Sequence, residues 1–221
     1  MVITGRLDDF RDLWAEATTH LGQESMKDWW TARELYSWVR RYPEEAYKCG
    51  LACIDQLGRL TTLGAPQTTT IFYRDSSFAG YDAAQLMEIA GDAGFRVSAI
   101  LLEDFSVLPV PSVVHLRVEH FVVVQQRDGY FYRVMDPVRE GARWLTAEEL
   151  AQEATGCLLV SANSDVTGVG AFTLLNSTEA SQFRGRCYHG GLIDVYDGCP
   201  GATSPGGGSC SNGDGCPAGW G

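Results

Sequence analysis

The stretch HFVVVQQRDGYFYRVMDP, residues 120–137, decides the fold of this chain. Two runs of β-branched and aromatic residues flank Arg127-Asp128-Gly129, and Asp-Gly between such runs is typical of a β-hairpin turn. His120 and Asp136 are equally far from this turn along their strands. Antiparallel pairing therefore predicts that they lie opposite each other on one face of a sheet.

Helical and extended patterns alternate on both sides of this hairpin. The spacing of apolar residues predicts helices over 49–60 and 82–93, and Thr146 with Glu149 forms a capping box that starts a short helix to about residue 154. Short runs of β-branched and aliphatic residues predict further strands over 96–101, 112–116 and 157–161. These elements predict an α+β fold in which helices pack on an antiparallel sheet.

The composition changes twice along the chain. Residues 1–41 have helical periodicity and predict an N-terminal helical extension. Residues 42–161 carry the α+β pattern of the main domain. Residues 162–221 become rich in glycine and cysteine, and they predict a flexible tail, because such a stretch buries too little apolar surface to offset its ordering entropy.

Charge and hydropathy narrow the function classes. The chain has 221 residues and a formal net charge of −11, and it lacks the basic face that a nucleic-acid partner requires. No stretch reaches the roughly 18 apolar residues that span a bilayer, and charged residues interrupt any signal peptide near the start. We therefore expect no nucleic-acid partner and no membrane span, and a cytoplasmic location is favoured.

Cys49 is the candidate nucleophile. It stands where a helical pattern begins, and both a helix N-terminus and the cationic neighbour Lys48 stabilise the thiolate form. Gly50 lacks a side chain and would let a substrate carbonyl approach the backbone. The alternative is that Cys49 is a small buried hydrophobic residue. The His120–Asp136 pair favours catalysis, because a carboxylate orients the histidine that a cysteine nucleophile needs.

The other cysteines have simpler interpretations. Cys53 and Cys157 are expected in the core. The four cysteines of the tail could form two disulfides, bind zinc with His189, or remain free thiols; their spacing favours disulfides or free thiols, and they are Cys187, Cys199, Cys210 and Cys216. We expect no cofactor and no catalytic metal.

Several of these runs resemble the bacteriocin-processing double-glycine leader peptidases, over about residues 42–161. The similar runs are KCGLAC (48–53), GYDAAQL (80–86), SVVHL (112–116), HFVV (120–123) and DP (136–137). This resemblance implies a papain-like cysteine peptidase that cleaves a leader peptide after a Gly-Gly or Gly-Ala pair. It implies Cys49 as nucleophile, His120 as base and Asp136 as its partner. It also implies a peptide or precursor-protein substrate and a peptide-exporting ABC transporter as a partner.

Two positions depart from the family pattern. The family has a glutamine six residues before the cysteine, where it donates to the oxyanion, and this chain has Pro43 there. Gln23 could replace it only if the N-terminal helices fold back. Lys48 stands where the family usually has an acidic residue. The alternative functions are therefore a catalytically weak module that binds leader or export-substrate peptides and, with less support, a thiol transferase or amidase on the same scaffold.

Overall fold

The computed structural model describes residues 7–20, 27–61, 69–138 and 141–187. The helices of these residues are α1 (Leu7–His20), α2 (Lys27–Arg41), α3 (Pro43–Ala46), α4 (Cys49–Thr61), α5 (Thr69–Phe72), α6 (Ala83–Asp92), α7 (Ala147–Glu153) and α8 (Ser177–Ala180). The strands are β1 (Tyr81–Asp82), β2 (Val97–Leu102), β3 (Val110–Leu116), β4 (His120–Asp128), β5 (Phe131–Met135), β6 (Ala142–Thr146), β7 (Ala154–Asp165), β8 (Phe172–Leu174) and β9 (Arg184–Gly185).

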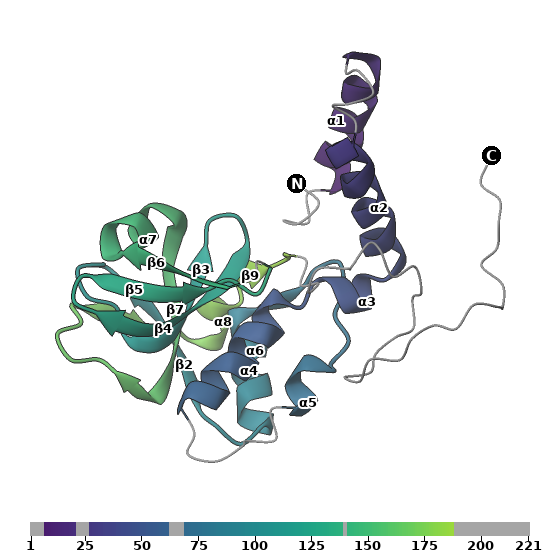
Figure 1. Ribbon diagram of the computed structural model, residues 1–221. Coiled ribbons are helices and arrows are strands. Elements are labelled where there is room, and N and C mark those ends of the chain that lie inside the picture. The colour runs from purple at the N-terminus through teal and green to yellow at the C-terminus, as the bar shows by residue number, and fades with distance from the viewer. Residues whose placement is uncertain (1–6, 21–26, 62–68, 139–140, 188–221) are drawn as a thin grey trace, which may run out of the picture. The chain divides into compact units, whose positions relative to one another are not determined.

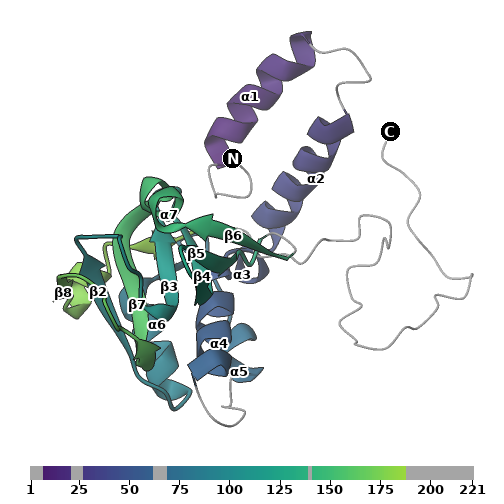
Figure 2. The same ribbon diagram turned by 60° about the vertical axis from the view of Figure 1, so that its left-hand side comes forward.

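A seven-stranded antiparallel sheet forms the centre of the fold, with the strand order β6-β5-β4-β3-β7-β2-β8. Helices α4, α5 and α6 lie on the same side of this sheet in both views (Figures 1 and 2). Strands β1 and β9 form a separate antiparallel pair. The predicted α+β class, with helices packed on an antiparallel sheet, is confirmed.

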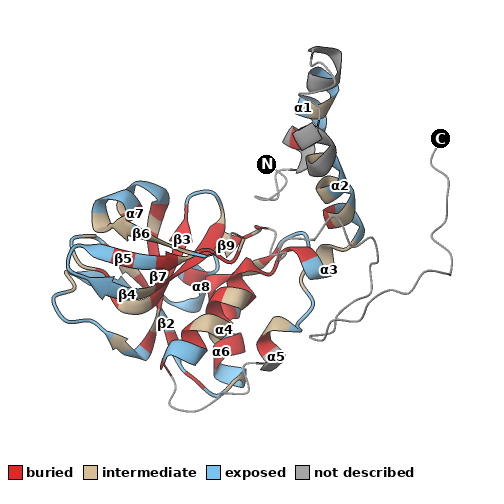
Figure 3. Ribbon diagram, viewed as in Figure 1, coloured by how far each residue is buried: buried red, intermediate tan, exposed pale blue. Residues whose placement is uncertain are grey.

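The sheet separates two layers of core. On one face, α4 and α6 bury Leu51, Ile54 and Leu86 against Phe121 and Leu159 of the strands. On the other face, α7 contributes Leu150 to a second cluster, which also contains sheet residues such as Val114, Val122 and Leu158. Figure 3 shows this pattern as buried segments concentrated on the central strands and on α4 and α6. The first five residues of β4 are all buried, because both faces of the strand are covered there.

The hairpin of β4 and β5 forms as predicted, but its register differs. Asp128 pairs with Phe131, so the turn is the two residues between them, with Gly129 at a φ of 58°. The register then shifts by one residue at Gln125, and the pairing ends at Val123 with Met135. His120 therefore does not lie opposite Asp136, and the predicted register is wrong by two residues. The two side chains still meet, because diagonal neighbours on adjacent strands lie within reach.

Reciprocal capping boxes mark the start of two helices. Asp82 caps α6 through its side chain, which accepts from the Gln85 backbone N–H, while Gln85 reciprocates to the Asp82 N–H. Thr146 and Glu149 make the same reciprocal capping box at the start of α7. Each box satisfies two N–H groups that have no intrahelical partner, and the box predicted at Thr146 places the start of α7 correctly.

The N-terminal segment is helical, as predicted. The Phe10 ring of α1 lies 5.2 Å from the Tyr36 ring of α2, measured between centroids. One turn further along α2, Val39 is buried with Ala46 and Tyr47. The interpretation of residues 1–41 as a separate extension stays a prediction.

Residues 162–187 differ from the expected flexible tail. Strand β7 continues to Asp165, and β8 adds to the edge of the large sheet through β2. Asn176 then caps α8, and β9 pairs with β1. Residues 188–221, including three of the tail cysteines, lie outside the described residues. No helix within the described ranges is long and apolar enough to cross a bilayer.

Replacing Leu159 by alanine tests the layer between the sheet and α4. Leu159 is fully buried, so the change is expected to reduce the free energy of unfolding by about 2–5 kcal/mol through lost burial and a cavity. The measurement is urea denaturation followed by circular dichroism. The control Val118→Ala, at a side chain that is 56% exposed, should change the free energy by less than about 0.5 kcal/mol. Equal effects of the two substitutions would contradict this account of the core.

Candidate active site

Cys49 is the first residue of α4, and it is fully buried where this helix packs against β4. Its backbone N–H is one of the first N–H groups of a helix, which lack intrahelical acceptors and create a positive electrostatic potential. The structure gives Gly50 a different role from the predicted substrate approach. A Cβ atom there would lie 2.9 Å from a Leu86 methyl and 3.4 Å from the Phe121 ring. Gly50 therefore allows α4 to approach α6 and β4 closely.

His120 and Asp136 form a buried hydrogen-bonded pair. His120 Nε2 lies 2.7 Å from Asp136 Oδ1, and both side chains are at least nine-tenths buried. The same carboxylate oxygen accepts from the Val138 backbone N–H at 2.9 Å, which fixes the turn that follows β5. Because Nε2 is committed to Asp136, the other ring nitrogen, Nδ1, remains for a reacting partner.

Cys49 is the candidate for that partner. Among the described residues, the buried His120 Nδ1 makes no hydrogen bond, and Cys49 is a thiol whose pKa His120 lowers. Burial raises the pKa of the Cys49 thiol, but the neighbouring Cys187 and His120 and the charge of His120 outweigh burial and hold this pKa well below its ordinary value. Burial lowers the pKa of His120, whereas the Asp136 hydrogen bond and the Cys49 thiolate raise it overall to about 9. The lowered pKa of Cys49 and the raised pKa of His120 together favour a thiolate–imidazolium pair.

Lys48 does not act on Cys49 as the sequence suggested. Its ammonium group lies 2.7 Å from a Glu45 carboxylate oxygen and 5.6 Å from the centre of the Phe72 ring. These contacts hold the Lys48 ammonium group, so its charge does not act on the Cys49 thiol. The positive charge that stabilises the thiolate comes from His120 instead.

Pro43 opens the short helix α3, at the position where the family pattern has glutamine. A proline carries no side-chain donor, so this position supplies nothing to an oxyanion. Gln23, the other candidate donor, lies outside the described residues.

Three further cysteines are described, and all are buried free thiols. Cys53 and Cys157 lie in the core, as predicted, and burial raises the pKa of Cys157 to about 12. Cys187 was assigned to the tail but lies in the site, where its Sγ is 3.6 Å from the Glu119 carbonyl oxygen. The neighbouring Cys49, together with burial, raises the pKa of Cys187. No spacing signal in the sequence could have placed Cys187 there, because the contact spans more than 130 residues.

Glu119 and His115 also contribute to the site. Glu119 precedes His120 with a φ of 57°, a left-handed conformation that is unusual for a residue with a side chain. His115 of β3 contacts the Thr155 hydroxyl at 3.1 Å and the Arg184 carbonyl at 2.9 Å. Burial lowers the pKa of His115, so the charged histidine of the site is His120.

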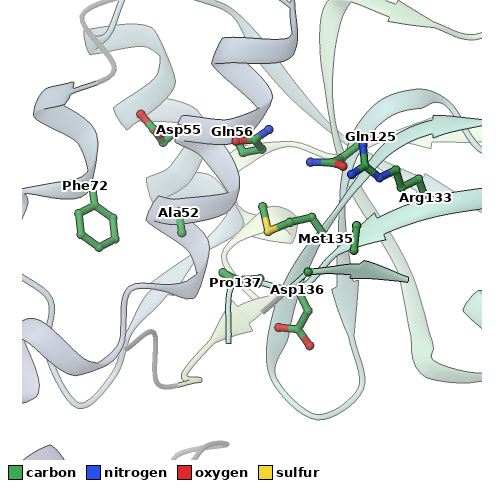
Figure 4. Close-up of a pocket in the computed structure, with 11 residues that line it drawn as sticks. Ala52, Asp55, Gln56, Phe72, Gln125, Arg133, Met135, Asp136 and Pro137 are labelled. Atoms are coloured by element: carbon green, nitrogen blue, oxygen red, sulfur yellow. The ribbon is translucent and has the colours of Figure 1, made fainter. Parts of the chain in front are cut away.

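A polar pocket lies beside α4, and residues of α5 and β5 also line it. It has a volume of about 460 Å³, and Asp55, Gln56, Gln125 and Arg133 line it together with the backbone near Asp136. Figure 4 shows the Asp136 carboxylate pointing away from Gln125 and Arg133. The pocket therefore borders the Asp136 turn without containing the reacting atoms. Within the described ranges, no group of histidine, cysteine and acidic side chains could hold a metal ion.

An α+β domain that presents a helix N-terminal cysteine to a buried His–Asp pair has the architecture of a papain-like domain. The Peptidase C39 family matches residues 40–165, which is more than half of the chain. The chain therefore belongs to the Peptidase C39 family, and the resemblance to double-glycine leader peptidases is confirmed.

Relatives in Escherichia coli are secretion and processing proteins. The colicin V secretion/processing ATP-binding protein CvaB is 31% identical over 131 residues, and the probable microcin-H47 secretion/processing ATP-binding protein MchF is 29% identical over 133 residues. Each alignment covers 55% of this chain and 18% of the relative, so the chain spans less than a fifth of their length. A solved double-glycine-motif protease from an AMS/PCAT transporter, in complex with the leader peptide, is 22% identical with a TM-score of 0.43. That match covers 53% of this chain and 85% of the protease.

The pH dependence of Cys49 alkylation tests the ion pair. The rate should follow thiolate formation with a midpoint well below the ordinary thiol value, because His120 stabilises the thiolate. In His120→Ala, burial remains without this stabilisation, so the midpoint should move to higher pH. The measurement is iodoacetamide labelling mapped by mass spectrometry, with Cys157 as an internal thiol that should stay unlabelled at neutral pH. An unchanged midpoint in His120→Ala would contradict the assignment.

Proposed function

We propose that this chain is a cysteine peptidase that cleaves leader peptides after a Gly-Gly or Gly-Ala pair, with Cys49, His120 and Asp136 as its catalytic residues. The observation that carries the proposal is the buried network in which Asp136 holds His120 at 2.7 Å and His120 faces the Cys49 thiol. Family membership supports the reaction class.

The first half of the reaction forms an acyl-enzyme. The Cys49 thiolate attacks the scissile carbonyl carbon, and the carbonyl electrons move to oxygen. As the tetrahedral intermediate collapses, His120 donates its proton to the leaving amine, and a thioester to Cys49 remains. The proton is available at neutral pH because the pKa of His120 is raised to about 9. Asp136 keeps the imidazole oriented throughout.

The second half releases the peptide. A water molecule attacks the thioester while the now neutral His120 accepts its proton. The C–S bond breaks, the leader leaves with a new carboxyl terminus, and Cys49 returns as thiolate beside a protonated His120. The pair is lost when His120 deprotonates, so activity should fall as pH rises through about 9.

The absent glutamine weakens the oxyanion site. The Cys49 backbone N–H at the start of α4 remains as one donor, while Pro43 provides none. Loss of a single oxyanion donor typically costs about 100- to 1000-fold in turnover. This departure favours the second candidate, a peptidase-like module that binds leader or export-substrate peptides and cleaves them slowly.

The proposed partners are supported by the names of the two relatives. The names of CvaB and MchF describe secretion and processing proteins that bind ATP. We propose that the partner of this domain is a precursor peptide and, through it, a peptide-exporting ABC transporter. The cytoplasmic location stays a prediction.

Cleavage of a synthetic leader that ends in Gly-Gly and continues into a cargo sequence tests the function. Wild type should release the leader with a free Gly-Gly terminus. Cys49→Ala and His120→Ala should abolish this release, and Asp136→Asn should slow it by roughly 10³- to 10⁴-fold, because the imidazole loses its orienting carboxylate. The measurement is product formation followed by mass spectrometry.

Cys53→Ala is the matched control, since it removes a buried cysteine one helical turn further along α4. Cleavage that persists in Cys49→Ala would refute the nucleophile. Saturable leader binding without cleavage, at every pH between about 6 and 9, would favour the binding module.

A further inference from the structure

Residues 183–187 cross the site above Cys49, and we call them the strap. They lie outside the residues that match the family, which end at 165. Their extended backbone follows α8 and forms β9 at Arg184 and Gly185. In Figure 1, β9 lies at the end of the sheet near the start of α4.

One side of the strap binds β1. Gly185 pairs with Tyr81 and Arg184 pairs with Asp82 in an antiparallel ladder, which the Ala83 N–H extends by donating to the Phe183 carbonyl at 2.9 Å. The Arg184 guanidinium adds an ion pair with the Asp82 carboxylate. The Arg184 guanidinium also donates hydrogen bonds to the backbone carbonyls of Ala79, at 3.3 Å, and Gly80, at 3.2 Å.

The other side of the strap binds the turn that precedes His120. The Arg186 backbone N–H donates to the Glu119 carbonyl at 2.8 Å, and its Nε donates to the Glu119 carboxylate at 2.7 Å. Cys187 Sγ lies 3.6 Å from the same carbonyl oxygen. The left-handed backbone conformation of Glu119 is therefore part of a turn that hydrogen-bonds to the strap.

Cys49 lies beneath the strap. A Cβ atom on Gly185 would lie 3.0 Å from Cys49 Sγ and 2.4 Å from the Phe121 ring, so only glycine fits at this place. Two residues later, the buried Cys187 thiol lies close enough to Cys49 to lower the pKa of its thiol. The peptide units between Gly185 and Cys187 thus pass over the nucleophile, which has no exposed surface.

We propose that the strap is an intramolecular peptide ligand of the catalytic cleft, and that it must leave before another peptide can reach Cys49. It has the features that the cleft requires of a substrate: an extended backbone, hydrogen bonds to both walls, and a glycine where no side chain fits. The identity of the nucleophile rests on the proposed function, whereas the occupancy of the cleft rests on the contacts above. A leader peptide would then compete with the strap, and cleavage by the wild type would be slow until the strap is released.

Two substitutions in the full chain release the strap by different means. Gly185→Val places a side chain against Phe121 and Cys49 Sγ. Arg184→Ala removes the contacts with Asp82, Ala79 and Gly80 and leaves Gly185 intact. The control is Gly91→Ala, at a helical glycine where an added Cβ meets nothing within 4 Å.

The readout is the rate of iodoacetamide labelling of each cysteine at neutral pH. Cys187 reports release of the strap, Cys49 reports access to the nucleophile, and Cys157 reports unfolding. In both strap variants, Cys187 and Cys49 should react about tenfold faster or more than in wild type, because several hydrogen bonds of the strap are lost. Cys157 should not change, and Gly91→Ala should behave as wild type.

Three other labelling or cleavage results would each decide a different part of the proposal. Equal labelling of Cys187 and Cys49 in wild type and both strap variants would overturn the proposal. Faster labelling of Cys187 with an inert Cys49 would support the strap and refute Cys49 as nucleophile, so the two failures are distinguishable. A Cys49-dependent cut of the wild-type chain within 183–187, seen by intact-mass spectrometry, would also overturn it, since the strap would then be a substrate.

Discussion

The close approach of α4 to β4 is the constraint on which the rest of the site depends. Gly50 permits this approach, because any side chain there would meet Leu86 and Phe121. The approach brings the first turn of α4 to the first residues of β4, so that a sulfur from the helix faces an imidazole from the sheet. The core residues on this face of the sheet fix the separation of the two elements to the precision of side-chain packing. The same arrangement of the backbone therefore produces both the catalytic geometry and the hydrophobic packing.

Electrostatic compensation makes this buried arrangement tolerable. An isolated thiolate or imidazolium in the core would be costly, and burial alone opposes both charges. The charges stabilise each other, and Asp136 adds a hydrogen bond that is itself held by the Val138 N–H. The histidine nitrogens have separate tasks, since Nε2 fixes orientation and Nδ1 faces the sulfur. This division follows from Asp136 lying just after β5, beside the first residue of β4.

Sequence reasoning found the parts of the site that depend on local patterns. The helix start at Cys49, the capping boxes and the hairpin each have short-range signals, and the structure contains them. The register was wrong because the turn consists of the two residues between Asp128 and Phe131 and not of Arg127–Gly129, and the shift at Gln125 recovers only one residue of this difference. The position of Cys187 was missed for another reason: glycine-rich composition indicates low burial on average, yet it does not show which glycine fits against another element. Gly185 is such a case, and its neighbours were therefore assigned to a tail.

The pairing of β1 with β9 has a consequence for how this domain is bounded. The family match ends before β8, α8 and β9, although these elements complete the fold around the nucleophile. A chain ended at residue 165 would leave the backbone N–H and C=O groups of β1 unpaired beside an uncovered cleft. Unpaired strand edges of this kind recruit other extended chains, whether substrates or further copies. In this chain β9 pairs with the short β1 edge, so the segment that follows the family domain satisfies the backbone groups beside the nucleophile.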